Sequence, residues 1–78
     1  MTRIISVQSL GDGWSVRSDA FDSEMMFLSG AKAEAAARRL AATLAKNGES
    51  SEIRIFLRDG RLAGRVVKPA NGPASLAG

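Results

Sequence analysis

The stretch AKAEAAARRLAATLAKN, from Ala31 to Asn47, is the segment whose pattern most clearly predicts a helix. Its apolar positions recur at spacings of four, three and four residues, which is the period of one helix face. Ser29 is a suitable N-cap, and Gly48 is a suitable residue to end the helix. Because alanine buries little area, this helix needs a broad apolar partner. The predicted buried face and its flanks are Ala33, Ala36, Ala37, Leu40, Ala41 and Leu44.

Two segments before the helix alternate between apolar and polar residues, as half-buried strands do. Residues 3–9 place Ile5 and Val7 on one side of the first strand. A glycine-rich turn leads into residues 14–18, and a turn of even length would place Val16 on the same side as Val7. We therefore expect that side of the sheet to face the core.

The sharpest turn signal is Asp59-Gly60, which separates two further alternating segments. This dipeptide favours a two-residue hairpin loop, because a type I′ turn needs positive φ at both central positions. The predicted pairs across this hairpin are Arg58 with Arg61, Leu57 with Leu62, Ile55 with Gly64, Arg54 with Arg65, and Ile53 with Val66. The side chains that would then face the helix are Ile53, Ile55, Leu57, Leu62 and Val66.

The order of elements is β-β-(β)-α-β-β, where the bracketed strand is residues 25–28. That segment is either a short strand, with Met25 and Phe27 inward, or an irregular approach to the helix. We expect an α+β fold with an antiparallel sheet of four or five strands and one helix packed on one face. This single domain spans residues 1–68. Residues 69–78 contain both prolines and lack periodicity, so we expect a disordered tail there.

The composition excludes several kinds of chemistry. The chain of 78 residues has no cysteine, histidine or tyrosine, so it lacks a thiol nucleophile and a histidine base. We therefore expect no enzymatic activity, no cofactor and no small-molecule substrate. Asp19, Asp22 and Glu24 could hold a hard cation, but they lack the spacing of a calcium loop. A solvated loop is the simpler interpretation, and no metal site is expected.

Sequence features also bear on location. No apolar run approaches the roughly 20 residues that span a bilayer, and the N-terminal residues lack the charged leader and apolar core of a signal peptide. The absence of cysteine is compatible with a reducing compartment. These features predict a cytoplasmic protein without membrane contact.

The outer face of the last hairpin carries the first candidate site. Four arginines surround a phenylalanine there, and guanidinium groups bind phosphate while an aromatic ring can stack on a base. This pattern predicts weak binding of nucleic acid or another polyanion. It is also typical of a solvated strand whose charges prevent unwanted pairing. The residues of this candidate polyanion or partner surface are Arg54, Phe56, Arg58, Arg61 and Arg65.

A second candidate uses the same outer face as an apolar surface. If the first three strands join the sheet, several apolar side chains point away from the helix, and monomers rarely leave a large apolar patch in water. A homodimer or a protein partner would cover such a patch, with arginines at its rim. The residues of this candidate dimer patch are Ile4, Leu10, Met26, Leu28, Phe56 and Val67.

Two family resemblances extend these expectations. The motifs Gly13-Trp14-Ser15-Val16, Ser29-x-x-x-Ala33-x-x-x-Ala37 and Asp59-Gly60-Arg61 resemble a small bacterial family of unknown function. That resemblance covers roughly residues 3–66 and implies a stand-alone sheet-and-helix domain without an assigned activity. The first half is also similar to the three-strand-plus-helix DNA-binding domain at the N-terminus of some phage-type integrases. This second resemblance implies DNA contact through the open sheet face, which here would carry the nearly neutral set Ser6, Gln8, Ser15, Arg17, Asp19 and Glu24.

Overall fold

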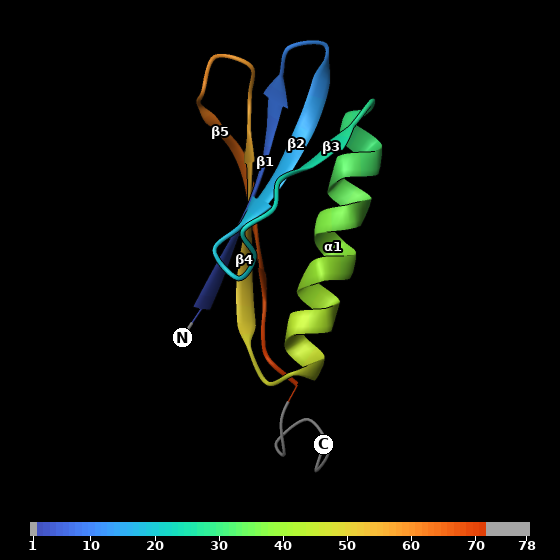
Figure 1. Cartoon of the computed structure of the whole chain (residues 1–78). Coiled ribbons are helices and arrows are strands. Elements are labelled where there is room, and N and C mark those ends of the chain that lie inside the picture. Colours follow the sequence, from blue (N-terminus) through green and yellow to red (C-terminus); the bar gives the residue numbers. More distant parts are fainter. Residues whose placement is uncertain (1, 72–78) are drawn as a thin grey trace.

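The computed structural model describes residues 2–71 and shows a helix packed along one face of a five-stranded sheet. Figure 1 shows the helix on one side of the twisted sheet, with the opposite side of the sheet left open. The elements are β1 (Thr2–Leu10), β2 (Gly13–Ser18), β3 (Met25–Phe27), α1 (Gly30–Lys46), β4 (Ser50–Phe56) and β5 (Leu62–Lys68).

The alanine-rich segment forms helix α1, as predicted. The Ser29 hydroxyl accepts a hydrogen bond from the backbone N–H of Lys32 at 3.1 Å, so the predicted N-cap is present. Gly48 follows the helix with a φ of 84°, a left-handed conformation that glycine adopts without strain. The buried residues of the helix are Ala33, Ala36, Ala37, Ala41, Leu44 and Ala45.

The first hairpin also follows the prediction. Its loop consists of Gly11 and Asp12, and Gly11 takes a φ of 60°. Because this loop has an even length, Val7 pairs with Val16, and their exposures are 1% and 0%. The predicted core face of β1 and β2 is therefore confirmed.

The sheet has the strand order β3-β2-β1-β4-β5, and β1 pairs with β4 in parallel. The expectation of a wholly antiparallel sheet was therefore wrong, although residues 25–27 do form the short third strand. The reason is the direction of α1. The chain reverses at each of the two connections before β3, again between β3 and α1, and once more between α1 and β4, so β4 runs in the same direction as β1 (Figure 1). Since β2 occupies one side of β1, β4 pairs on the other side.

The second hairpin differs from the predicted two-residue turn. The backbone N–H of Gly60 donates to the Leu57 carbonyl at 2.9 Å, and the N–H of Leu57 donates to the Arg61 carbonyl at 2.7 Å. Gly60 has a φ of 90°, whereas Asp59 does not have positive φ. These bonds define a three-residue loop with a type I turn and a left-handed glycine, not a type I′ turn.

A second irregularity compensates for the longer loop. The register shifts between Ile55 and Phe56, so that Phe56 pairs with Leu62 while Ile55 pairs with Gly64. Ala63 is the extra residue of this bulge. Beyond it the register is the predicted one, since the remaining pairs of the hairpin include Arg54 with Arg65 and Ile53 with Val66.

The two irregularities move two leucines and two arginines away from their predicted places. Leu57 and Leu62 were expected to face the helix, but they are 45% and 49% exposed. Leu62 lies opposite Phe56 and therefore shares its outer face. Arg58 and Arg61 do not form a strand pair, because both lie in the connection between β4 and β5.

The core lies between α1 and the face of the sheet that carries Ile5, Val7, Val16 and Ile53. Trp14 and Phe27 pack against this cluster, and the Trp14 ring lies against Gly30 at the start of the helix. Within the described residues, no helix is long and apolar enough to cross a membrane.

At the C-terminal end, the backbone N–H of Asn71 donates to the Ala45 carbonyl at 2.9 Å, which places the end of the described chain beside the end of α1. The expectation of a disordered tail concerns residues 69–78, and residues 72–78 lie outside the described part.

Candidate interaction surface

The open face of the sheet carries its side chains in rows that follow from the strand pairing. Side chains directly opposite each other on neighbouring strands share a face, so each row can be read from β3 across to β5. We call the row that runs from Met26 to Leu62 the apolar row, and the next row away from the hairpin loops the charged row. The apolar row is Met26, Ser15, Gln8, Phe56 and Leu62; the charged row is Arg17, Ser6, Arg54 and Arg65.

The apolar row leaves large side chains in contact with water. Met26 is 54% exposed and Leu62 is 49% exposed, at opposite edges of the sheet. Ser15 lies between them on the same face and is 0% exposed, although α1 is on the other side of the sheet. Longer side chains of the open face must therefore lean over Ser15. This packing makes the centre of the apolar row a closed surface rather than a gap.

The charged row contains the like-charge pair that the sequence predicted. Arg54 and Arg65 lie directly opposite each other, an arrangement that is unfavourable without a counterion. Glu52 supplies the counterion: its carboxylate accepts a hydrogen bond from Arg54 Nε and lies 4.0 Å from Arg65 Nε. The Glu52 side chain is only 15% exposed, so this carboxylate lies beneath the two guanidinium groups.

Carboxylates accompany most of the other arginines on this side. Arg61 Nε donates to Asp59 at 2.7 Å within the turn, and Arg17 Nε lies 3.7 Å from Glu24. Arg58 is exposed in the same turn and makes no ion pair with any of the described residues. The predicted set of arginines is thus only partly brought together: Arg54 and Arg65 lie on the sheet, and the other two lie on the loop.

The predicted apolar patch is divided in two by the charged row. Met26 and Phe56 belong to the apolar row, whereas Ile4 and Val67 flank Glu52 four residues further along the strands. That separation corresponds to about 13 Å at the usual rise of a strand. Leu28 follows β3 and is 89% exposed, close to Leu10 and Met26 at the corner of the sheet.

Sequence reasoning missed Leu62 as a member of the open face. The missing signal is the bulge at Ala63, which no turn motif in the sequence announces. Asp19 was also assigned only to a loop. Its carboxylate accepts a hydrogen bond from the Ile4 backbone N–H at 3.1 Å, so it satisfies a donor of β1 just beyond the end of β2.

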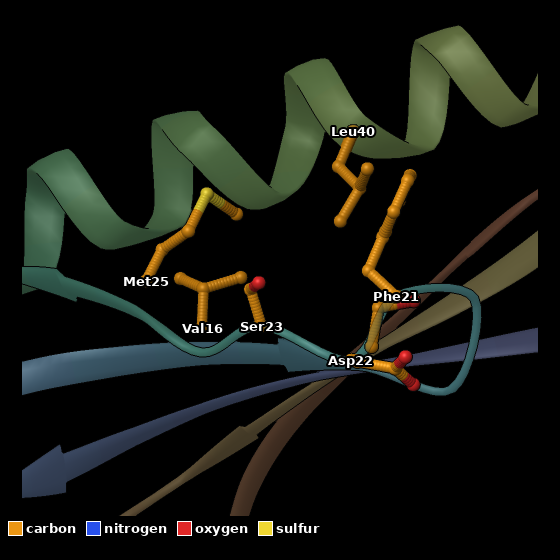
Figure 2. A pocket seen from close by; sticks show the side chains of 7 residues that line it. Val16, Phe21, Asp22, Ser23, Met25 and Leu40 are labelled. Carbon is orange, nitrogen blue, oxygen red and sulfur yellow. The ribbon is translucent and has the colours of Figure 1, made fainter.

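A cavity of about 450 Å³ lies between α1 and the connection from β2 to β3 (Figure 2). Figure 2 shows Leu40 reaching down from the helix, with Phe21 rising beside it from the connection. The walls are mainly apolar, and Asp22 is the charged group at the rim. The sequence did not indicate this cavity, because Phe21 stands in a polar connection without periodicity. The lining residues are Val16, Ser18, Phe21, Asp22, Ser23, Met25 and Leu40.

The described residues contain no group of acidic side chains arranged to hold a metal ion. Asp19, Asp22 and Glu24 have separate surroundings: Asp19 contacts the Ile4 amide, Asp22 lines the cavity, and Glu24 lies near Arg17.

Comparisons with protein-family models, curated proteins and solved structures give no match for this chain. The resemblances to the small bacterial family and to the integrase DNA-binding domain therefore stay predictions.

Proposed function

We propose that this chain is a non-enzymatic binding domain that forms a homodimer through the open face of its sheet. The observation that carries the proposal is the apolar row, whose Met26, Phe56 and Leu62 lie on a face that no described element covers. Single exposed apolar residues are ordinary on protein surfaces. Here Met26 lies at one edge of the face and Phe56 and Leu62 lie toward the other, with Ser15 and Gln8 between them. A partner that covers the whole row would bury all three apolar side chains.

The charges of the open face favour a second copy as the partner. Arg54 and Arg65 surround Glu52, and Arg17 lies beside Glu24, so three arginines and two carboxylates lie on this side. A strongly basic partner would meet the arginines, and a strongly acidic one would have to displace Glu52 or Glu24 from them. A two-fold axis brings each sign of one copy within reach of the opposite sign of the other.

The size of the face sets the expected affinity. Five strands spaced about 4.8 Å apart give a width of roughly 19 Å, and about seven residues on a rise of about 3.3 Å give a length of roughly 23 Å, although β3 has only three residues. The face therefore covers at most about 440 Å² in plan, which is less than the roughly 800 Å² that each partner usually buries in a stable dimer. We therefore expect a weak, reversible dimer with a dissociation constant of roughly micromolar order or weaker.

The polyanion hypothesis for this face stays a prediction with less support from the geometry. Three of its four arginines, Arg54, Arg61 and Arg65, lie close to carboxylates of the same chain. A phosphate group would have to displace the Glu52 or Asp59 carboxylate from these guanidinium groups. If it did not, the carboxylate would repel the phosphate. Cytoplasmic location, lack of a cofactor and lack of enzymatic activity also stay predictions.

Sedimentation equilibrium over a range of protein concentrations tests the dimer. In the double variant Met26→Glu/Leu62→Glu, four carboxylates would be buried in each dimer, and we expect it to sediment as a monomer at concentrations where the wild type dimerises. The matched control is Ala35→Glu/Ala42→Glu, which adds the same charge on the exposed side of α1 and leaves the open face unchanged.

Added salt distinguishes the dimer hypothesis from the polyanion hypothesis for the open face. An apolar dimer persists as salt is added, whereas the affinity for phosphate groups falls steeply. A wild type that stays monomeric at high concentration would contradict the proposal, as would a double variant that still dimerises.

A further inference from the structure

The charges outside helix α1 cancel. Of the eleven cations and eight carboxylates of the chain, seven cations and seven carboxylates lie outside α1, so strands and connections together contribute no net charge. Helix α1 carries four cations, Lys32, Arg38, Arg39 and Lys46, and one carboxylate, Glu34. These account for a charge of +3, which is the net charge of the whole chain.

Three of the helix cations form a line, which we call the basic stripe: Lys32, Arg39 and Lys46. Neighbouring members are seven residues apart, and seven residues fall only about 20° short of two helical turns. At a rise of about 1.5 Å per residue, the charges lie about 10.5 Å apart along roughly 21 Å of helix. All three residues are exposed, and at about 100° per residue they lie roughly opposite the buried residues of α1.

The basic stripe differs from the arginines of the sheet in lacking counterions. Glu34 lies 3.3 Å from Arg38, which is outside the stripe. Among the described residues, none of the three stripe cations makes an ion pair. A phosphate that approaches the stripe therefore displaces only water.

We propose that the basic stripe of α1 binds the sugar-phosphate backbone of duplex nucleic acid without sequence preference. The spacing of about 10.5 Å is close to the roughly 12 Å width of the major groove, so neighbouring cations can reach phosphates on both strands that border it. Ala35 and Ala42 lie exposed between the cations, and their short side chains let the duplex approach the helix closely. They also offer no group that reads base edges, so the contacts are electrostatic.

A membrane surface fits the stripe less well than a duplex does. Amphipathic helices that bind bilayers insert large apolar side chains beside their cations. In α1 the leucines face the sheet, since Leu44 is buried and Leu40 packs against the core. The apolar residues on the exposed side are alanines, which give little apolar area to insert.

Two variants with the same change in net charge test the proposal. The first is Lys32→Gln/Arg39→Gln/Lys46→Gln, which neutralises the stripe and keeps residues that favour helix. The second is Arg58→Gln/Arg61→Gln/Arg65→Gln, which neutralises three arginines of the second hairpin. Both lower the net charge by three, so a difference between them reports the site and not the overall charge. Circular dichroism verifies that each variant is folded.

Fluorescence anisotropy with a labelled duplex of mixed sequence supplies the measurement. We expect wild-type affinity to fall roughly 40-fold between about 50 and 200 mM salt, as three phosphate contacts predict. The stripe variant should bind at least about tenfold more weakly than wild type at the lower salt, with little remaining salt dependence. The hairpin variant should stay within about threefold of wild type.

Several results would overturn the proposal: equal losses in the two variants, a larger loss in the hairpin variant, or no wild-type binding at low salt. Binding to vesicles of anionic lipid in preference to the duplex would also refute it. The stripe does not overlap the open face, so the sedimentation test of the dimer and this binding test can fail independently.

Discussion

The two faces of the sheet are built from alternate residues of the same strands, yet they are stabilised in different ways. Under α1, Ile5, Val7 and Val16 are at most 1% exposed, and the packing consists of aliphatic side chains against alanines. On the open face, apolar side chains are half exposed, and the charged row depends on Glu52 beneath two arginines. The covered face therefore supplies most of the folding free energy, and the open face is free to serve an interaction.

The largest difference in the free energy of unfolding is expected between two neighbouring isoleucines of β1. Ile5 is 0% exposed on the covered face, whereas Ile4 is half-buried on the open face. Ile5→Ala leaves a cavity under the helix and should lower the free energy of unfolding by about 2–5 kcal/mol. Ile4→Ala should cost less than about half of that, because its site already contacts water.

Urea denaturation at low protein concentration, where the domain is monomeric, measures both values. Equal losses for the two variants would show that the open face is packed as closely as the covered one.

The next effect concerns the turn that places Leu62 on the open face. Gly60 has a φ of 90°, and an added Cβ would meet nothing within 4 Å, so Gly60→Ala is strained only through its backbone. We expect a loss of about 1–2 kcal/mol in the free energy of unfolding. Gly64 is the control, because it also has open space but lacks positive φ. Gly64→Ala should be neutral or stabilise the domain by up to about 1 kcal/mol. A neutral Gly60→Ala would contradict the three-residue loop.

The same turn shows how far the sequence predicts this fold. Asp59-Gly60 correctly located the reversal of the chain, but the dipeptide is compatible with loops of two or three residues. The difference of one residue decides the face of Leu62, and the bulge at Ala63 restores the register beyond it. Pairs such as Arg54 with Arg65 were therefore predicted correctly even though the turn type was wrong.

Local patterns predicted the elements better than their pairing. The Ser29 cap, the alanine face of α1 and the even-length loop at Gly11 each have a local cause, and each is confirmed. The parallel pairing of β1 with β4 depends on the path of the chain through α1, which joins residues 48 positions apart. No short motif encodes such a contact.

The charges of the candidate site were also predicted only in part from the sequence. The sequence placed Arg54 and Arg65 on the open face, but the burial of Glu52 beneath them depends on the strand order and on side-chain packing. The basic stripe could have been found from the sequence, by adding charges over each predicted element instead of over the hairpin alone.

A smaller effect on the free energy of unfolding, of opposite sign, is expected at the buried Ser15. Ser15 is 0% exposed on the open face, and its hydroxyl has no hydrogen-bond partner among the described residues. Ser15→Ala removes an unsatisfied buried group and should raise the free energy of unfolding by about 1 kcal/mol. The Ser18 hydroxyl accepts a hydrogen bond from the Ala20 N–H at 3.0 Å, so Ser18→Ala should instead lower it by about 1 kcal/mol. Thermal unfolding followed by circular dichroism gives both signs. A destabilised Ser15→Ala would show that this hydroxyl is satisfied, for example by water that enters the open face.

The smallest effect is expected at Glu52, where the open face depends on charge instead of packing. Glu52→Gln removes the counterion shared by Arg54 and Arg65 and leaves the two guanidinium groups opposed. We expect the free energy of unfolding to fall by no more than about 1 kcal/mol, because both arginines can move toward water. Repulsion between exposed cations is screened by salt, so the loss should shrink as salt is added.

The matched control for Glu52→Gln is Glu34→Gln, which breaks the ion pair with Arg38 on α1 and leaves no opposed cations in a strand pair. That change should cost only about 0.3–0.5 kcal/mol. Urea denaturation of both variants at low and high salt separates lost attraction from new repulsion. If Glu52→Gln costs no more than Glu34→Gln at low salt, then the carboxylate is not what keeps the charged row together, and the arginines of the open face are freer to bind an anion than their geometry indicates.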